Sequence, residues 1–152
     1  MRPLAVALLV AFAASSVSAA DKNEEKAKDA VVAFLKAVKA KDADAVMKVS
    51  AAPFAYKDGE DVAVLKDTDA LKKWVKERLE ELKDTDKVPT EISEFHTYAE
   101  IKEKIKNEEH RKKIEEVLGK DGYVAVIMAD GKMVPILVRI KDGKAAVVGF
   151  GR

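Results

Sequence analysis

The sequence contains no cysteine, and this absence excludes several kinds of chemistry. Without a cysteine sulfur there is no disulfide framework, thiolate metal site, catalytic thiol or bacterial lipid anchor. The chain has 152 residues, which is enough for one sizeable hydrophobic core but not for two. We therefore expect one small domain whose stability depends on that core alone.

The chain also has no marked excess of charge of either sign. Its 28 lysines and arginines are balanced by 27 aspartates and glutamates. A nucleic-acid-binding domain contacts phosphates and needs a basic excess on at least one surface. Nucleic acid is therefore not expected as a partner.

The first twenty residues are almost free of charge, with Arg2 as their only charged residue. An apolar run covers residues 4–14, and residues 15–20 are small and weakly polar. This order is typical of an export signal, and the run is shorter than the roughly 20 apolar residues that a membrane crossing requires. We therefore expect residues 1–20 to be a signal peptide. Residues 21–152 are then a single exported domain, periplasmic or secreted, without a membrane span.

Hydrophobic spacing predicts helices and a hairpin in the first half of the mature chain. Apolar residues recur every three or four positions over residues 27–38, which predicts an amphipathic helix. Asp42 can cap a second, short helix, which we expect Pro53 to close. Asp58 and Gly59 predict a tight turn between two strands, because glycine tolerates the positive φ that such turns need.

A third helix is expected to begin near Asp69, and it carries the only tryptophan of the chain. Its apolar stripe includes Trp74 and is interrupted by Arg78. Because the stripe must be buried, we expect Trp74 to lie in the core against the first helix. Pro89 then separates this helix from residues 90–98, whose alternation predicts an edge strand with one polar face.

The last third of the chain predicts a change from helix to sheet. Residues 99–118 favour two short helices with a break near Asn107, because their apolar positions cannot share one face of a straight helix. Residues 123–150 then predict a three-stranded antiparallel meander. Its turns are expected at the two Asp-Gly pairs, residues 130–131 and 142–143.

Three short phrases carry a likeness to a known family. They are Ala-Val-Val-Ala-Phe-Leu at residues 30–35, Tyr-Lys-Asp-Gly at residues 56–59 and Val-Val-Gly-Phe at residues 147–150. With the order of elements, they resemble the nuclear transport factor 2-like superfamily, above all its small exported bacterial members of unassigned activity. The resemblance implies an α+β cone, in which N-terminal helices pack on a strongly curved, mostly antiparallel sheet. Residues 99–118 would be a helical insertion before the C-terminal three-stranded meander. An insertion at this place would change the shape of the pocket mouth.

The resemblance leaves function open, because the superfamily includes steroid isomerases, dehydratases, polyketide cyclases, transport factors and binding modules. In isomerase-like members a carboxylate near the first hairpin is the base, and Asp58 is the nearest candidate. A carboxylate in an Asp-Gly turn is solvated, whereas a general base needs burial to raise its pKa. The resemblance also implies that Tyr56 and Trp74 line a pocket.

The motifs of the common enzyme chemistries are missing from the sequence. There is no Gly-x-Ser-x-Gly sequence and no glycine-rich phosphate loop. The two histidines, His96 and His110, lie far apart in the sequence and lack the short spacing of a zinc site. We therefore expect neither a metal nor a cofactor.

The strongest constellation of polar side chains is Glu94, His96 and Tyr98. The two-residue period of a strand places successive members on one face, about 7 Å apart. On a concave face they would hold a ligand or form an acid–base set, and otherwise they would be the solvated side of an edge strand. Arg78 also has two possible interpretations, one functional and one structural. It would either reach into a pocket toward an acidic ligand or rest its stem on the core with its head in water.

These observations favour an exported, non-enzymatic binding or interaction module for a small hydrophobic ligand or a protein partner. The candidate ligand-binding residues are Tyr56, Trp74, Arg78, His96 and Tyr98. An alternative is a small lyase or isomerase that works by acid–base chemistry in a hydrophobic pocket, with the constellation above or Asp58 as its groups. A further alternative is a structural protein that forms a homodimer through its sheet.

Export predicts a mature chain that begins at Ala20 or Asp21, because cleavage is expected after Ala19 or Ala20. N-terminal sequencing of the protein isolated from its native host measures this directly. A mature chain that still begins at Met1 would contradict the prediction.

Overall fold

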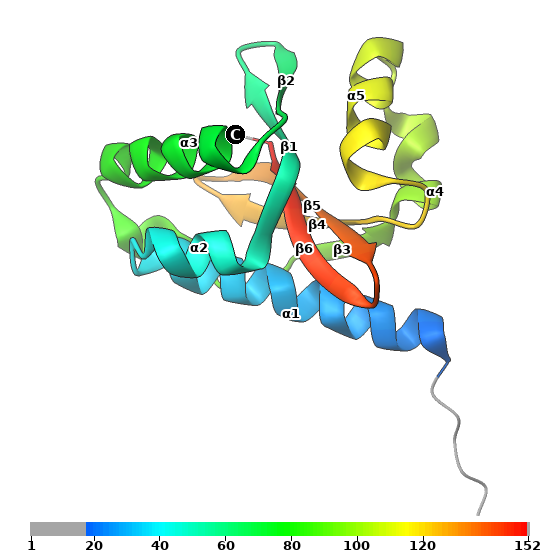
Figure 1. The fold of residues 1–152 in the computed structure, drawn as a ribbon, viewed down its shortest axis with the longest axis horizontal. Coiled ribbons are helices and arrows are strands. Elements are labelled where there is room, and N and C mark those ends of the chain that lie inside the picture. The colour runs from blue at the N-terminus through cyan, green and yellow to red at the C-terminus, as the bar shows by residue number, and fades with distance from the viewer. Residues whose placement is uncertain (1–17, 152) are drawn as a thin grey trace, which may run out of the picture.

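The computed structural model describes residues 18–151, so most of the predicted signal peptide lies outside the described residues. The described part of the chain begins with two helices and ends with three consecutive strands (Figure 1). The helices are α1 (Ala19–Lys39), α2 (Ala43–Val49), α3 (Thr68–Glu81), α4 (Tyr98–Ile101) and α5 (Glu108–Leu118), with short 3₁₀ turns η1 (Thr85–Lys87) and η2 (Lys102–Lys104). The strands are β1 (Ser50–Asp58), β2 (Asp61–Leu65), β3 (Glu94–Thr97), β4 (Tyr123–Ala129), β5 (Lys132–Lys141) and β6 (Lys144–Phe150).

The strands form one mixed sheet in the order β2-β1-β6-β5-β4-β3. Every neighbouring pair is antiparallel except β1 and β6, which run parallel. The sheet is strongly twisted, and β1 and β6 turn away from the direction of β4 and β5 (Figure 1). The predicted α+β arrangement is confirmed: N-terminal helices pack on a curved, mostly antiparallel sheet, and a helical insertion precedes the three-stranded meander.

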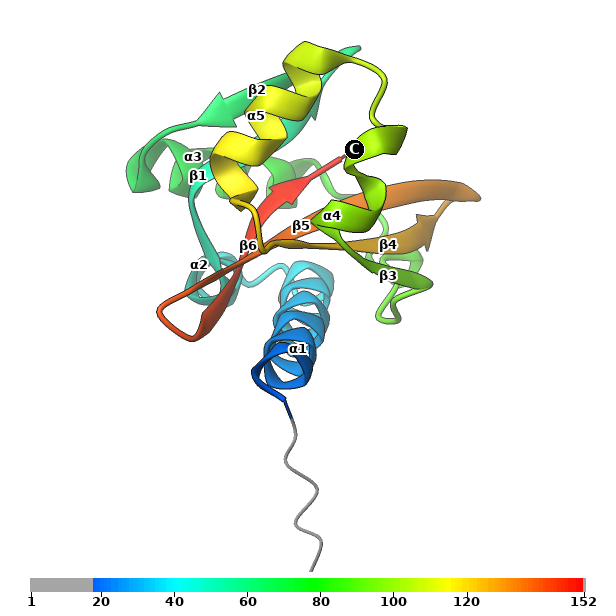
Figure 2. The same ribbon diagram turned by 90° about the vertical axis from the view of Figure 1, so that its right-hand side faces the viewer.

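Helices cover both faces of this sheet (Figure 2). Both faces are covered because the side chains of β4 are buried on both sides of the sheet. Tyr123, Ala125 and Ile127 belong to the hydrophobic cluster on the side of α1, α2 and α3. Val124 between them belongs to a second cluster, which α4 and α5 complete with residues such as Leu118. The insertion therefore lies on the face opposite the N-terminal helices.

The two N-terminal helices follow the sequence pattern closely. The predicted stripe of α1 is buried at Ala27, Val31 and Phe34, among others. Asp42 caps α2, because its carboxylate accepts a hydrogen bond from the backbone N–H of Ala45 at 2.9 Å. The expectation for the end of α2 was wrong. The chain turns directly into β1 after Val49, and Pro53 lies inside that strand rather than closing the helix.

The predicted edge strand is confirmed as β3, but it is shorter than residues 90–98. Thr97 and Glu100 form a capping box, in which the Glu100 carboxylate accepts a hydrogen bond from the Thr97 backbone N–H at 2.8 Å. A helix therefore starts where the alternation of side chains was expected to continue. The break at Asn107 is confirmed, because its side chain caps α5.

None of the helices within residues 18–151 combines the length and the apolar character that a bilayer crossing requires.

Both predicted Asp-Gly turns of the meander are present and have positive φ at both positions. The φ angles are 52° and 72° at Asp130 and Gly131, and 52° and 71° at Asp142 and Gly143. These values match the tight hairpin turn in which both central residues are left-handed. The turns fix the register of β4, β5 and β6, and residues of β4 and β6 form one wall of the site described below.

Replacement of these glycines is expected to destabilise the meander. Gly131→Val and Gly143→Val should each lower the free energy of unfolding by about 1 kcal/mol or more, because a β-branched residue resists positive φ. Urea unfolding measures the change, with Lys132→Val and Lys144→Val as controls at neighbouring strand positions. Equal stability of the glycine variants and the parent protein would contradict this account of the turns.

Candidate functional site

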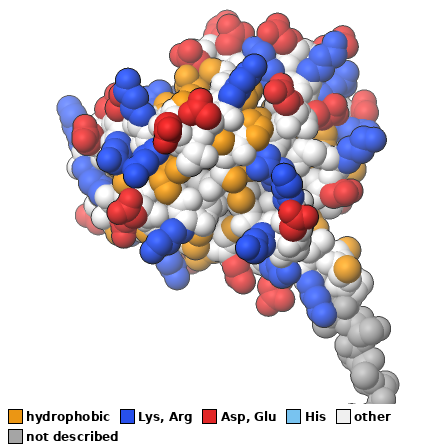
Figure 3. Space-filling model, viewed as in Figure 1, with side chains coloured by type: hydrophobic (Ala, Val, Ile, Leu, Met, Phe, Trp, Pro, Cys, Tyr) orange, Lys and Arg blue, Asp and Glu red, His pale blue; other side chains and the backbone are white. Residues whose placement is uncertain are grey.

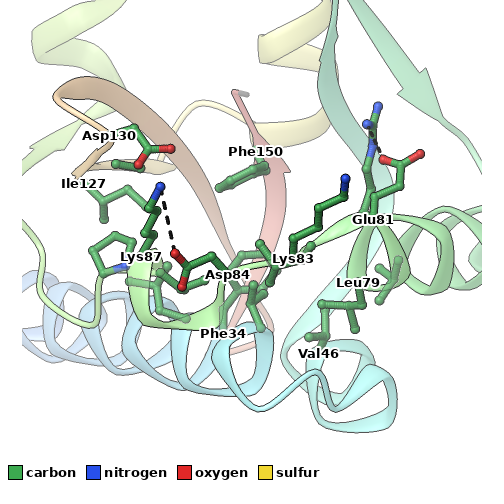
Figure 4. A pocket seen from close by; sticks show the side chains of 18 of the residues that line it. Phe34, Val46, Leu79, Glu81, Lys83, Asp84, Lys87, Ile127, Asp130 and Phe150 are labelled. Atoms are coloured by element: carbon green, nitrogen blue, oxygen red, sulfur yellow. Dashed lines mark hydrogen bonds and ion pairs between the residues drawn. The ribbon is translucent and has the colours of Figure 1, made fainter.

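An apolar pocket lies between the N-terminal helices and the sheet face that they cover (Figure 4). Its volume is about 500 Å³, within the range of sites that hold small organic ligands. Helices α1, α2 and α3 supply one wall, and β4 and β6 supply the other. The connection from α3 to β3 contributes the rest of the lining through Leu82, Lys83, Asp84, Lys87, Val88 and Pro89.

The interior of the pocket is assembled from distant parts of the sequence. Phe34 of α1 and Phe150 of β6 meet with their ring centroids 6.1 Å apart. Ile127 and Ala129 face the helices from β4, because alternate residues of a strand share one face. The pocket therefore forms only when the first helix packs on the last strands.

Polar and apolar side chains are separated along the pocket lining. Every apolar lining residue is buried or half-buried, and every charged one is exposed. The charged residues are Arg78, Glu81, Lys83, Asp84, Lys87 and Asp130. They form the rim of the pocket. Lys and Arg are also interspersed with Asp and Glu over the face of the molecule seen in Figure 3. The pocket therefore offers an apolar interior behind a charged rim.

Two ion pairs organise the rim (Figure 4). Arg78 contacts the Glu81 carboxylate at 3.0 Å, and Lys87 lies 3.9 Å from the carboxylate of Asp84. The Arg78 guanidinium also lies 5.6 Å from the centre of the Trp74 ring. Arg78 thus rests over an aromatic face while its charge stays exposed at the mouth, which combines the two alternatives that the sequence left open.

Trp74 lines the pocket but does not pack as predicted. Its ring centroid lies 5.3 Å from Phe54 and 5.2 Å from Tyr56, both in β1. Helix α3 packs against α2 and β1, so Trp74 faces the strand rather than the first helix. The indole is half-buried, and its Nε1 has no hydrogen-bond partner among the described residues. Tyr56 contacts the Trp74 ring but is not itself part of the pocket lining.

The predicted polar constellation lies on the other face of the sheet. Glu94 and His96 do face the same way, and their side chains are hydrogen-bonded at 3.1 Å. Their register opposite Val126 and Val124 places them on the side of the second hydrophobic cluster. Tyr98 follows in α4, outside the strand. These residues are therefore remote from the apolar pocket.

Tyr98 is buried in the second hydrophobic cluster, and its hydroxyl has a hydrogen-bond partner. Its hydroxyl donates a hydrogen bond to the Glu115 carboxylate of α5 at 3.1 Å, which ties α4 to α5. Burial, and then this hydrogen bond, raise the pKa of Tyr98 to about 12. The phenol therefore keeps its proton at neutral pH and joins the two helices of the insertion.

Asp58, the last candidate residue, and the α3–β3 connection, which was not predicted as part of a site, have the following positions. Asp58 is exposed at the end of β1, where it pairs with Asp61. The hairpin turn is therefore formed by Gly59 and Glu60, one residue later than predicted. The α3–β3 connection was predicted only as a separator, although it supplies part of the pocket. The feature of the sequence that could have indicated this role is the apolar pair Val88-Pro89 inside a charged stretch. A search for helix or strand periodicity does not detect such a pair.

Titratable side chains do not gather into a metal site within the described part of the chain. His96 lies in β3, whereas His110 lies in α5 with its Nε2 3.6 Å from the Asp61 carboxylate. Residues 18–151 therefore give no reason to place a metal at the pocket.

Comparisons with known proteins concern the fold. No family model and no curated protein matches the chain. A designed protein of the nuclear transport factor 2-like type is similar at 9% identity and a TM-score of 0.38, over 84% of this chain and 96% of that one. A Xanthomonas campestris protein described as a calcium/calmodulin dependent protein kinase II association domain is similar at 12% identity and a TM-score of 0.39, over 78% and 77% of the two chains. Similarity at this level carries no argument about function, so the site is interpreted from its own residues.

Removal of the Tyr98 hydroxyl tests its structural role. At pH 7, Tyr98→Phe should lower the free energy of unfolding by about 1 kcal/mol, because the hydrogen bond to Glu115 is lost. Because the pKa of Tyr98 is raised to about 12 in the folded state, from about 10 for a free tyrosine, this contribution is complete below pH 10 and is lost as pH rises toward 12. Denaturant unfolding at several pH values should therefore show a smaller loss of stability between pH 10 and 12 in the variant. Parallel curves for the two proteins would contradict this assignment.

Proposed function

We propose that this chain is an exported, non-enzymatic binding module for a small hydrophobic ligand. The observation that carries the proposal is the apolar pocket of about 500 Å³, whose charged lining residues all lie at its exposed rim. Burial of apolar ligand surface in such a pocket is favourable without any covalent step. The sequence pattern of residues 1–20, which predicts an export signal, supports a role outside the cytoplasm.

The positions of the titratable groups support binding over catalysis. An acid or base must lie within hydrogen-bond reach of the proton that it moves. The interior of the pocket is lined by apolar side chains, and Glu94, His96 and Tyr98 lie on the opposite face of the sheet. A lyase or isomerase would have to use the exposed rim carboxylates, which water solvates.

A homodimer is the second candidate, and one exposed apolar pair favours it. Met128 and Met133 are paired across β4 and β5, with 45% and 59% of their surfaces exposed. Met128 points away from the apolar pocket, because its neighbours Ile127 and Ala129 line that pocket. Exposed apolar side chains of this size are common at contacts between subunits. Sedimentation velocity of the parent protein distinguishes a dimer from a monomer.

Ligand binding can be followed through the single tryptophan, because Trp74 lines the pocket. Decan-1-ol is a suitable uncharged probe, and its titration should change the fluorescence of Trp74 with a Kd on the order of 100 µM or tighter. Ala129→Phe and Val38→Phe both place a ring into the pocket from opposite walls. Each should weaken decan-1-ol binding by about tenfold or more, because the ring occupies the space of the probe.

The matched control is Val126→Phe, which adds the same kind of bulk on the other face of β4. It should leave decan-1-ol binding unchanged. Far-UV circular dichroism and thermal melts identify variants that fail to fold. The two pocket variants lie in different elements, so that the test does not depend on the folding of either one alone. Folded pocket variants that bind decan-1-ol as the parent does would overturn the proposal, as would a parent protein that does not bind it.

A further inference from the structure

A second cavity of about 560 Å³ adjoins the apolar pocket and differs from it in chemistry. It lies between the β1–β2 turn, α3 and the β4–β5 turn. Its lining is Lys57, Asp58, Gly59, Arg78, Ala129, Asp130, Lys132, Met133, Val134 and Gly151. Half of these residues carry a charge, so this cavity suits a polar group rather than a hydrocarbon.

The two cavities meet at three residues. Arg78, Ala129 and Asp130 line both of them. Asp130 stands at the edge of the apolar pocket in the close-up view (Figure 4). A molecule with two chemically different ends can therefore extend from the apolar pocket into the polar cavity.

The polar cavity has an excess of positive charge. Three of its lining residues are cationic, namely Lys57, Arg78 and Lys132, and two are acidic. Arg78 is already paired with Glu81. Within residues 18–151, neither Lys57 nor Lys132 forms an ion pair with an acidic side chain. The two lysines are therefore available to an anion that enters from the pocket.

We propose that the joined cavities bind an anionic amphiphile. Its hydrocarbon chain occupies the apolar pocket, and its anionic head group lies beside Lys57 and Lys132. This inference rests on the proposed function and deepens it, because it names the class of ligand. The apolar chain supplies most of the affinity, and the lysines select the sign of the head group.

The test compares two probes that have the same chain length and differ in the head group. Decanoate and decan-1-ol are titrated below their critical micelle concentration and solubility limit, with Trp74 fluorescence as the readout. The double variant Lys57→Gln/Lys132→Gln should weaken decanoate binding by about 3- to 10-fold, as expected for two partly exposed ion pairs. It should leave decan-1-ol binding unchanged. Added salt should weaken the binding of decanoate by the parent protein and have little effect on decan-1-ol.

The matched control removes two lysines outside both cavities. Lys72→Gln/Lys76→Gln, on the exposed side of α3, should change the binding of neither probe. Lys83→Gln tests the one cation of the pocket rim that forms no ion pair with a side chain of residues 18–151. A loss of decanoate binding in Lys83→Gln but not in the Lys57→Gln/Lys132→Gln variant would overturn the placement of the head group.

The outcomes separate this inference from the proposed function. Equal effects of the Lys57→Gln/Lys132→Gln substitutions on both probes, or no effect on decanoate, overturn the inference while decan-1-ol binding still supports the hydrophobic pocket. Failure of both probes to bind the parent protein overturns both proposals. Tighter decanoate binding that depends on the two lysines and on salt supports the anionic amphiphile.

Discussion

The burial of the central strands on both faces is the constraint on which the rest of the structure depends. Strand β4 alternates between two hydrophobic clusters, with Ile127 on the side of α1 and Val124 on the side of α4 and α5. A strand of this kind must be covered twice, and the helical insertion supplies the second cover. The N-terminal helices are then left on the other face, where their contact with the sheet is incomplete. The apolar pocket is the space that remains between them.

The distribution of charge around this space determines what the site is suited to do. Apolar side chains such as Phe34 and Phe150 occupy the interior, and ion pairs such as Arg78–Glu81 lie at the exposed rim. Groups in water keep their charges and attract or repel a ligand, whereas a catalytic acid or base needs a controlled environment close to the reacting atoms. The arrangement therefore fits recognition of a ligand with an apolar body better than acid–base chemistry on it.

Local patterns in the sequence predicted most of the fold and only part of the site. The capped helices and the two Asp-Gly turns were predictable because their causes lie within a few residues of each other. Arg78, which interrupts the apolar stripe in the sequence, lies exposed at the rim of the pocket, since a charge on an apolar stripe must emerge at an edge of the core. The polar alternation at Glu94 and His96 was also real, but a capping box begins α4 at Tyr98 and ends the strand. Alternation alone could not say which face of the sheet holds the ligand pocket.

The sequence by itself determined the class of the fold, the helix caps, the turns and the edge position of β3. The tertiary structure alone decided that Trp74 faces β1, that the α3–β3 connection lines the pocket, and that the insertion lies on the opposite face. The physical reason is the range of the interactions. Caps and turns are formed by neighbouring residues, whereas a pocket is a gap between elements that meet only after the whole sheet has assembled.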